Sequence, residues 1–347
     1  MKIFAKLALV LFLAASPVVA LAQTSGGGYS QAYLTRNVGA RASALAGAYT
    51  AVANEPSAIF YNPAGLSFLP GAPIFSTNVS YLGLDRYQSS LAWGQQINEF
   101  FGLGAGINAL TTGSFMGTDR AGRSIGEFNS NQYTLTVAGS YALEFASLGG
   151  AVKYCSDNLV GAGVDADGFA VDLGAKFNMM DILSMGVAVQ NLGGAMYWND
   201  ASGSVENLPF SLRLGLAMEL ALSSDNASEV TPTGENVEAY EPATRYALFS
   251  LDVIKRQYSV APSIVLGSEI VLHEAIALRG GISLYGDVNG SPRPLPGNEW
   301  GAGVSVRPTV DGFFDAIPVN LHIDYSASQE YLSPSGVTHS ISIILGF

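Results

Sequence analysis

The sequence has few charged residues, a single cysteine and no basic stripe. Only 13% of its 347 residues are charged, and the formal net charge is −12. This balance argues against nucleic acid as a partner, because nothing is present to neutralise phosphates. Cys155 cannot form an internal disulfide, and no local signature marks it as a catalytic thiol.

Long apolar runs are also lacking. After the N-terminal residues, no apolar stretch reaches the roughly 18 residues that a membrane-spanning helix needs. The mean hydropathy is nevertheless positive at +0.28, and the chain contains 40 glycines. A lipid-embedded chain without such helices must close its strands into a barrel, since unpaired backbone groups in hydrocarbon are costly. The composition therefore brings a membrane β-barrel into consideration.

The first residues predict a secretory signal peptide. Lys2 and Lys6 give a basic start, residues 7–19 are apolar, and small residues at positions 20–22 indicate cleavage near Ala22. We therefore expect residues 1–22 to be removed and the mature chain to reside in the bacterial outer membrane.

Residues 39–66, GARASALAGAYTAVANEPSAIFYNPAGL, differ from the chain that follows them. They are dense in alanine and glycine, and their spacing predicts a helix over residues 40–53. A turn follows at Asn62, Pro63, Ala64 and Gly65, in which proline fixes φ and glycine permits positive φ. Small side chains suit close packing, so we expect residues 23–70 to form a plug; the alternative is a small helix buried in a soluble domain.

From about residue 73 the pattern changes to a period of two. Between Tyr133 and Phe145 the odd positions are largely apolar and the even positions small or polar. This alternation predicts that residues 71–347 form about fourteen antiparallel strands of an all-β transmembrane barrel. The expected strands lie near residues 73–83, 87–95, 100–110, 131–145, 147–155, 167–178, 183–191, 208–220, 244–255, 262–271, 275–285, 298–307, 318–328 and 336–347.

Loop lengths favour a barrel over a soluble sheet. Long connections are expected at residues 111–130, 156–166, 192–207 and 286–297 on one side, with mostly short ones on the other. The connections at residues 221–243 and 308–317 are long on the side where turns should be tight, and the connection at residues 84–86 is short on the other side. Each of these three departures is a place where a strand could be miscounted.

Five charged or ionisable residues lie in the middle of predicted strands, at the alternate positions whose side chains point away from the apolar face. Such residues face either bulk water on a soluble sheet or the polar lumen of a barrel. Our hypothesis is a charge network that holds the plug, and solvated lumen residues without a particular task are the alternative. The five are Arg213, Asp252, Arg279, His322 and Asp324.

The last strand ends on an aromatic residue at the carboxyl terminus. Apolar residues occupy alternate positions before it, the pattern expected of a strand that closes a barrel against the first strand with its apolar face to lipid. A soluble β-sandwich is the alternative, but it has no reason to end on an exposed aromatic. The residues concerned are Ile341, Ile343, Leu345 and Phe347.

Residues 39–66, with SLRLGLAMEL (211–220), IALRGGISLYG (276–286) and GVTHSISIILGF (336–347), resemble the PorV/PorQ outer-membrane proteins, within the superfamily of FadL-type fatty-acid transporters. The resemblance implies a fourteen-stranded barrel whose N-terminal segment folds back as a plug. FadL-type members pass hydrophobic small molecules, whereas PorV-type members belong to the type IX secretion system and handle cargo proteins. The plug of about forty residues favours the PorV/PorQ branch.

We therefore expect a non-enzymatic component of protein secretion, in outer-membrane lipid and in contact with other secretion proteins; the alternative is FadL-like transport of hydrophobic small molecules such as long-chain fatty acids. A lipase is disfavoured, since His322 and His339 have opposite parity and no third orienting group is evident. Residues 165–168 (DADG) lack the remaining ligands of a calcium loop and read as a turn. No cofactor or metal is expected.

Overall fold

The computed structural model describes residues 30–180, 182–200, 203–222, 245–257, 259, 262–273, 275–284, 299–308, 320–329 and 336–347. Its strands are β1 (Ile74–Tyr81), β2 (Arg86–Gln96), β3 (Phe101–Thr112), β4 (Phe115–Thr118), β5 (Ser124–Ala142), β6 (Ala146–Val160), β7 (Val164–Met180), β8 (Leu183–Trp198), β9 (Val205–Asn207), β10 (Ser211–Ala221), β11 (Tyr246–Arg256), β12 (Ser263–His273), β13 (Ile276–Leu284), β14 (Glu299–Val306), β15 (Asn320–Gln329) and β16 (Thr338–Gly346).

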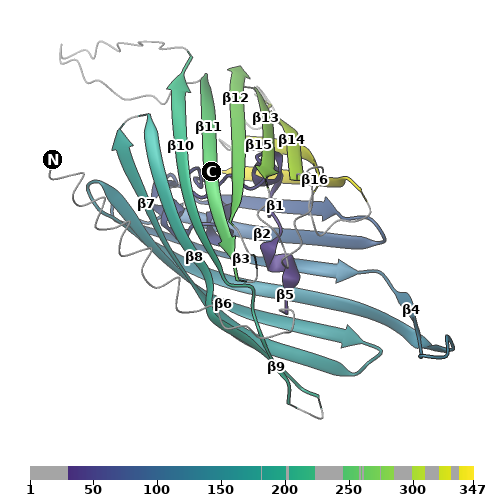
Figure 1. Ribbon diagram of the computed structural model, residues 1–347. Coiled ribbons are helices and arrows are strands. Elements are labelled where there is room, and N and C mark those ends of the chain that lie inside the picture. Colours follow the sequence, from purple (N-terminus) through teal and green to yellow (C-terminus); the bar gives the residue numbers. More distant parts are fainter. Residues whose placement is uncertain are drawn as a thin grey trace, which may run out of the picture.

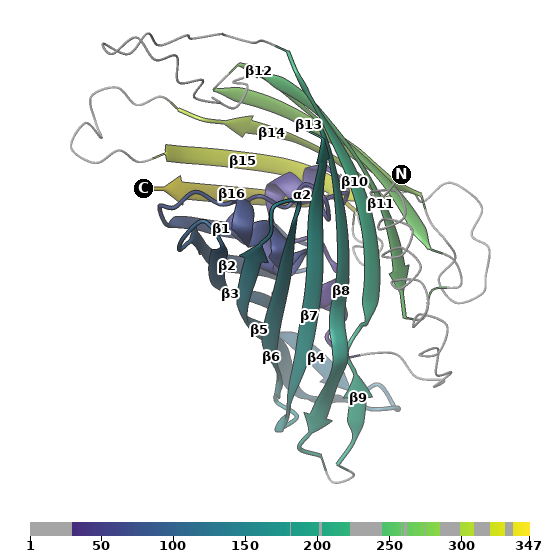
Figure 2. The ribbon, with the colours of Figure 1, turned by 90° about the vertical axis from the view of Figure 1, so that its left-hand side faces the viewer.

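These strands form one closed antiparallel barrel (Figures 1 and 2). Each strand of the ring pairs with its neighbour in sequence, β8 pairs with β10, and β16 pairs with β1 to close the ring. The short strands β4 and β9 stand outside the ring, attached to β5 and β8, so fourteen of the sixteen strands form the wall. The predicted fourteen-stranded barrel is confirmed.

The two faces of the wall differ as the period of two predicts. On β16, Ser340 and Ser342 are buried in the interior, whereas Ile341 and Ile343 are 54% and 38% exposed on the outside. A band of large apolar residues exposed on the outer face is typical of a lipid-facing barrel. Among the described residues, no helix is both long enough and apolar enough to cross a membrane.

The first and last strands meet along a seam that is polar inside and aromatic outside. In the interior, Ser80 Oγ lies 2.6 Å from Ser340 Oγ, and Ser342 Oγ donates to Asn78 Oδ1 at 3.0 Å. On the outside, Phe347 packs edge-on against Phe75, with ring centroids 6.1 Å apart. The alternating residues at the chain end thus supply the closing contacts of the barrel.

Four neighbouring strands, β5 to β8, are 15 to 19 residues long and extend beyond the others toward the β4 hairpin (Figure 1). The expectation of long loops at residues 111–130, 156–166 and 192–207 is therefore wrong, as is the turn at residues 165–168, which lie inside β7. Polar residues replace the apolar outer face in this extension, yet pairing continues, for example between Asn131 and Asn158. Most of the connections at 221–243, 286–297 and 308–317 lie outside the described residues.

The N-terminal segment, defined here as residues 30–70, contains four short helices: η1 (Ala32–Thr35), α2 (Ala40–Ala44), η2 (Pro56–Phe60) and η3 (Pro63–Phe68). They lie within the curve of the barrel wall (Figure 2). The helix expected over residues 40–53 ends at Ala44, because Ala46 and Gly47 take left-handed backbone angles, φ 53° and 92°, and turn the chain. Residues 1–29, including the predicted signal peptide, lie outside the described residues.

Candidate functional site

The N-terminal segment lies directly against glycines of the inner wall. A Cβ atom at Gly186 would overlap the carbonyl oxygen of Thr50, and one at Gly281 would overlap the backbone of Leu45. Because these opposing atoms are backbone, they cannot be moved by a change of rotamer. The glycines whose Cβ would approach the segment within 3.2 Å are Gly94, Gly102, Gly104, Gly106, Gly149, Gly174, Gly186, Gly215, Gly267, Gly281, Gly301 and Gly303. They account for part of the high glycine content.

A cluster of buried charges joins α2 to the wall, and we call it the Arg41 cluster. Arg41 donates from Nε and Nη2 to the two carboxylate oxygens of Glu269 at 2.8 and 2.9 Å, and from Nη1 to Glu55 at 2.8 Å. Arg279 also binds Glu269, and its Nη1 donates to Asp324 Oδ1 at 2.8 Å. Glu269 is fully buried between the two guanidinium groups, and such a buried pair depends strongly on each partner.

A second buried carboxylate holds the part of the segment that follows α2. Asp252 Oδ2 accepts hydrogen bonds from Thr50 N at 3.1 Å and from Thr50 Oγ1 at 2.5 Å. Arg213 Nη2 lies 3.4 Å from the same oxygen and donates to the carbonyl oxygen of Gly47 at 2.6 Å. The segment is thus hydrogen-bonded to β10 and β11 through both backbone and side chains.

The turn at Asn62 is held by its own side chain. Asn62 Oδ1 accepts from Ala64 N at 3.2 Å, and its Nδ2 donates to the carbonyl oxygens of Thr50 and Ala175 at 3.0 and 3.1 Å. Pro63, Ala64 and Gly65 continue as η3 and are buried. The expected positive φ at Gly65 is absent. Glycine is needed there for close approach, since a Cβ would overlap the carbonyl oxygen of Ala53.

The structure brings four of the five predicted lumen residues into these contacts. Arg213, Asp252, Arg279 and Asp324 are buried inside the barrel, whereas His322 is half-buried and takes no part in the ion pairs. Sequence reasoning missed several of their partners. Two of these partners could have been found from the sequence. Glu269 occupies the same set of alternate positions as the buried residues of β12, and Arg41 is the only charged residue between positions 36 and 55.

The barrel contains a cavity of about 340 Å³ at the end where β1 stops. Tyr33, Arg36, Leu82 and Leu110 are among its lining residues. The Tyr33 hydroxyl lies 2.7 Å from Thr134 Oγ1, and burial raises the pKa of the phenol, so it stays protonated at neutral pH. Leu34, the next residue, packs against an apolar cluster formed by Cys155, Ala166, Ala170, Met196 and Leu208.

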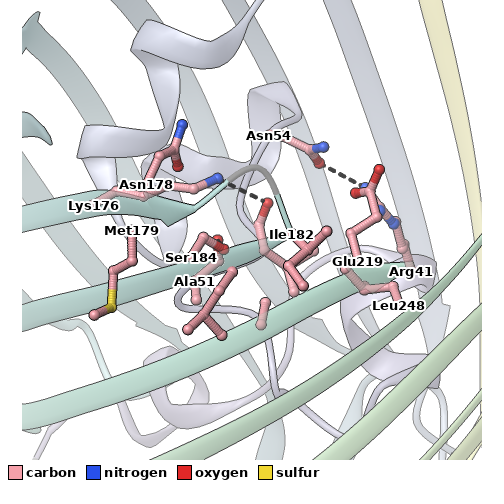
Figure 3. A pocket seen from close by; sticks show the side chains of 13 residues that line it. Arg41, Ala51, Asn54, Lys176, Asn178, Met179, Ile182, Ser184, Glu219 and Leu248 are labelled. Atoms are coloured by element: carbon pink, nitrogen blue, oxygen red, sulfur yellow. Dashed lines mark hydrogen bonds between the residues drawn. The ribbon is translucent and has the colours of Figure 1, made fainter. Parts of the chain in front are cut away.

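A second cavity, of about 500 Å³, lies at the opposite end, where β1 starts (Figure 3). Its lining includes Ala51, Val52 and Asn54 of the N-terminal segment and Met179 and Ile182 near the turn between β7 and β8. The two cavities share no lining residue. The N-terminal segment contributes to both and is packed against the wall between them.

The two histidines of the lipase comparison lie on opposite sides of the wall. His339 is exposed on the outside, where its Nδ1 lies 2.8 Å from the Tyr325 hydroxyl, and His322 faces the interior. They do not combine into one site. Within the described part of the chain, no group of three or more His, Cys, Asp or Glu side chains is placed to hold a metal ion.

No protein-family model and no curated protein matches the sequence. Solved structures with the same fold include the Ralstonia pickettii toluene transporter TbuX, at 13% identity and a TM-score of 0.53 over 89% of this chain and 97% of that one. A Pseudomonas aeruginosa FadL homologue matches at 12% identity and a TM-score of 0.53, covering 92% and 99% of the two chains. The P. putida toluene transporter TodX matches at 13% and 0.52, covering 89% and 96%.

At this level of identity the likeness establishes the fold, which is that of FadL-type outer-membrane channels. Membership of the PorV/PorQ group and a part in type IX secretion are not shown by these structures. The similar structures are described as transporters, which fits the expectation that the chain is not an enzyme.

Proposed function

We propose that this chain is an outer-membrane channel for small hydrophobic molecules and that the N-terminal segment is its plug. The observation that carries the proposal is the cavity of about 340 Å³ at one barrel mouth, which Tyr33, Leu82 and Leu110 line together with polar side chains. Its size falls within the usual range of small-molecule sites. The toluene transporters TbuX and TodX share the fold, which supports the same class of cargo.

The exposed apolar band on the outer face supports a place in the outer membrane. In bacterial barrels the short turns face the periplasm and the longer connections face outward. The turns between β2 and β3, β5 and β6, and β7 and β8 are tight, and the long strands β5 to β8 extend from the opposite end, so we take the end with these three turns as periplasmic. The 340 Å³ cavity is then at the outer mouth, and the 500 Å³ cavity is at the periplasmic mouth.

Passage between the two cavities requires the plug to give way. The plug backbone lies on the wall glycines, and the Arg41 cluster and Asp252 hold it there. A permeating molecule needs a path that these contacts fill, so part of the segment has to leave the wall during transport.

Deleting the gene is expected to lower the uptake of radiolabelled toluene or oleate several-fold, because apolar molecules cross the polysaccharide-covered outer membrane poorly without a channel. A plasmid carrying the wild-type gene should restore uptake, and the set of secreted proteins should stay the same. Comparing the proteins released by the two strains also tests the secretion role that the resemblance predicts. Unchanged uptake together with loss of secreted proteins would overturn the proposal in favour of secretion.

A further inference from the structure

The cavity at the periplasmic end contains a buried lysine whose Nζ makes no ion pair with a described residue. Lys176 is 6% exposed, and in the described part of the chain no carboxylate lies within ion-pair distance of its Nζ. The ammonium donates to the carbonyl oxygens of Val52 and Ala53 at 3.3 and 3.2 Å and lies 4.3 Å from the centre of the Phe68 ring. An ammonium has three donors, so one N–H remains for a further acceptor.

The other side of the same cavity contains an acidic group with no basic partner. The Glu219 side chain is exposed to the cavity, and no ion pair joins it to another described residue. Its neighbour Arg41 is already neutralised by Glu269 and Glu55. Figure 3 shows Lys176 on one side of the cavity and Glu219 with Arg41 on the other.

Amide and apolar groups also line this cavity. Asn54 and Asn178 offer polar contacts, while Met179, Ile182 and Leu248 are among the apolar lining residues. Lys176 when protonated and Glu219 when ionised carry one charge of each sign, so the cavity does not favour a simple anion or a simple cation. A molecule with an anionic group at one end and an ammonium at the other would satisfy both side chains at once.

We infer that this periplasmic cavity binds a zwitterion, with its anionic group at Lys176 and its ammonium group at Glu219. Two sources offer this chemistry: the phosphoethanolamine headgroup of a phospholipid, since the cavity lies at the membrane end of the wall, and a free ω-amino acid. The site is separate from the outer-mouth cavity and does not depend on the proposed transport function.

Binding is tested by calorimetry on the full-length protein in an uncharged maltoside detergent. The probes are glycerophosphoethanolamine and 6-aminohexanoate, and the controls with one charge are hexanoate and hexylamine. We expect at least one zwitterion to bind and both controls to bind about tenfold more weakly or not at all, since each lacks one charge-assisted contact. Glycerophosphoethanolamine alone would identify the lipid headgroup, whereas binding of both probes would identify a site for zwitterions in general.

Variants of the two charged side chains test which residue binds each end of the ligand. Glu219→Gln and Lys176→Met should each weaken zwitterion binding about ten- to a hundredfold. Glu99→Gln, which removes an exposed carboxylate outside the cavity at the same end of the barrel, should leave binding unchanged. Because Lys176→Met also removes contacts to the plug, Glu219→Gln is the decisive variant. Failure of both zwitterions to bind, hexanoate binding as tightly as 6-aminohexanoate, or full binding by Glu219→Gln would each overturn the inference.

Discussion

Replacing Glu269 by glutamine is expected to lower the free energy of unfolding by about 3–5 kcal/mol. The carboxylate is fully buried and binds both Arg41 and Arg279. Glutamine keeps the shape of the side chain but removes the negative charge, so the two guanidinium groups face each other across the lumen without it. The penalty comes mainly from these uncompensated buried cations, since the ion pair itself adds little net stability.

Urea titration of the purified protein, followed by the loss of the compact form on unheated gels, measures this change. Glu144→Gln, at an exposed position in the turn after β5, is the matched control and should leave the midpoint unchanged within error. The double variant Arg41→Met with Glu269→Gln should lose less unfolding free energy than the two single variants together, because it removes one of the two buried cations that Glu269→Gln leaves without a partner. Strict additivity would contradict the coupling of the plug to β12.

Replacing Gly281 by alanine is expected to displace the plug. A Cβ at this position would overlap the backbone carbon and oxygen of Leu45, and neither can move without the plug moving. Overpacking of this kind costs about 1–3 kcal/mol. We expect the variant to unfold at lower temperature than wild type and to admit more of a small hydrophobic dye across the outer membrane, since the plug no longer seals against β13.

The adjacent Gly280 provides the control for this variant. It lies on the same strand, and a Cβ there would meet no atom within 4 Å. Gly280→Ala should therefore behave as wild type in both measurements, or be slightly more stable because alanine restricts the unfolded chain. Equal behaviour of the two alanine variants would show that the wall glycine does not seat the plug.

The strands could be predicted from sequence because lipid on one side and a narrow interior on the other impose a period of two. The strand prediction failed where the outer face no longer has a lipid-facing apolar pattern. Beyond Tyr133 on β5 and Tyr154 on β6, most outward residues are polar and the apolar alternation breaks down, although Asn131 still pairs with Asn158. Backbone pairing alone imposes no pattern on side-chain polarity, so the sequence predicts loops where the strands extend.

The candidate site was predictable only in part, for a similar reason. Parity places Arg213 and Asp324 in the interior, but it says nothing of which residues meet across the barrel. The alternation of side chains also places Glu269 in the interior. It does not predict the contact of Glu269 with Arg41, because the two residues are 228 positions apart in the sequence. The length of α2 was not predicted either, because Ala46 and Gly47 take left-handed backbone angles that the helix propensity of the surrounding alanines does not indicate.

The proposed movement of the N-terminal segment during transport is tested most directly by a disulfide between this segment and the wall. A Cβ built at Gly267 lies 3.2 Å from the Cβ of Ala48. This is a few tenths of an ångström below the 3.5–4.5 Å found between the Cβ atoms of disulfides, so a small outward shift of the segment brings the pair into range. The variant Ala48→Cys with Gly267→Cys, in a Cys155→Ala background, should therefore cross-link on oxidation. Toluene uptake should then fall to the level of the gene deletion and return on reduction, while Ala48→Cys alone and Gly267→Cys alone respond to neither treatment. Complete cross-linking with unchanged uptake would contradict a plug that leaves the wall.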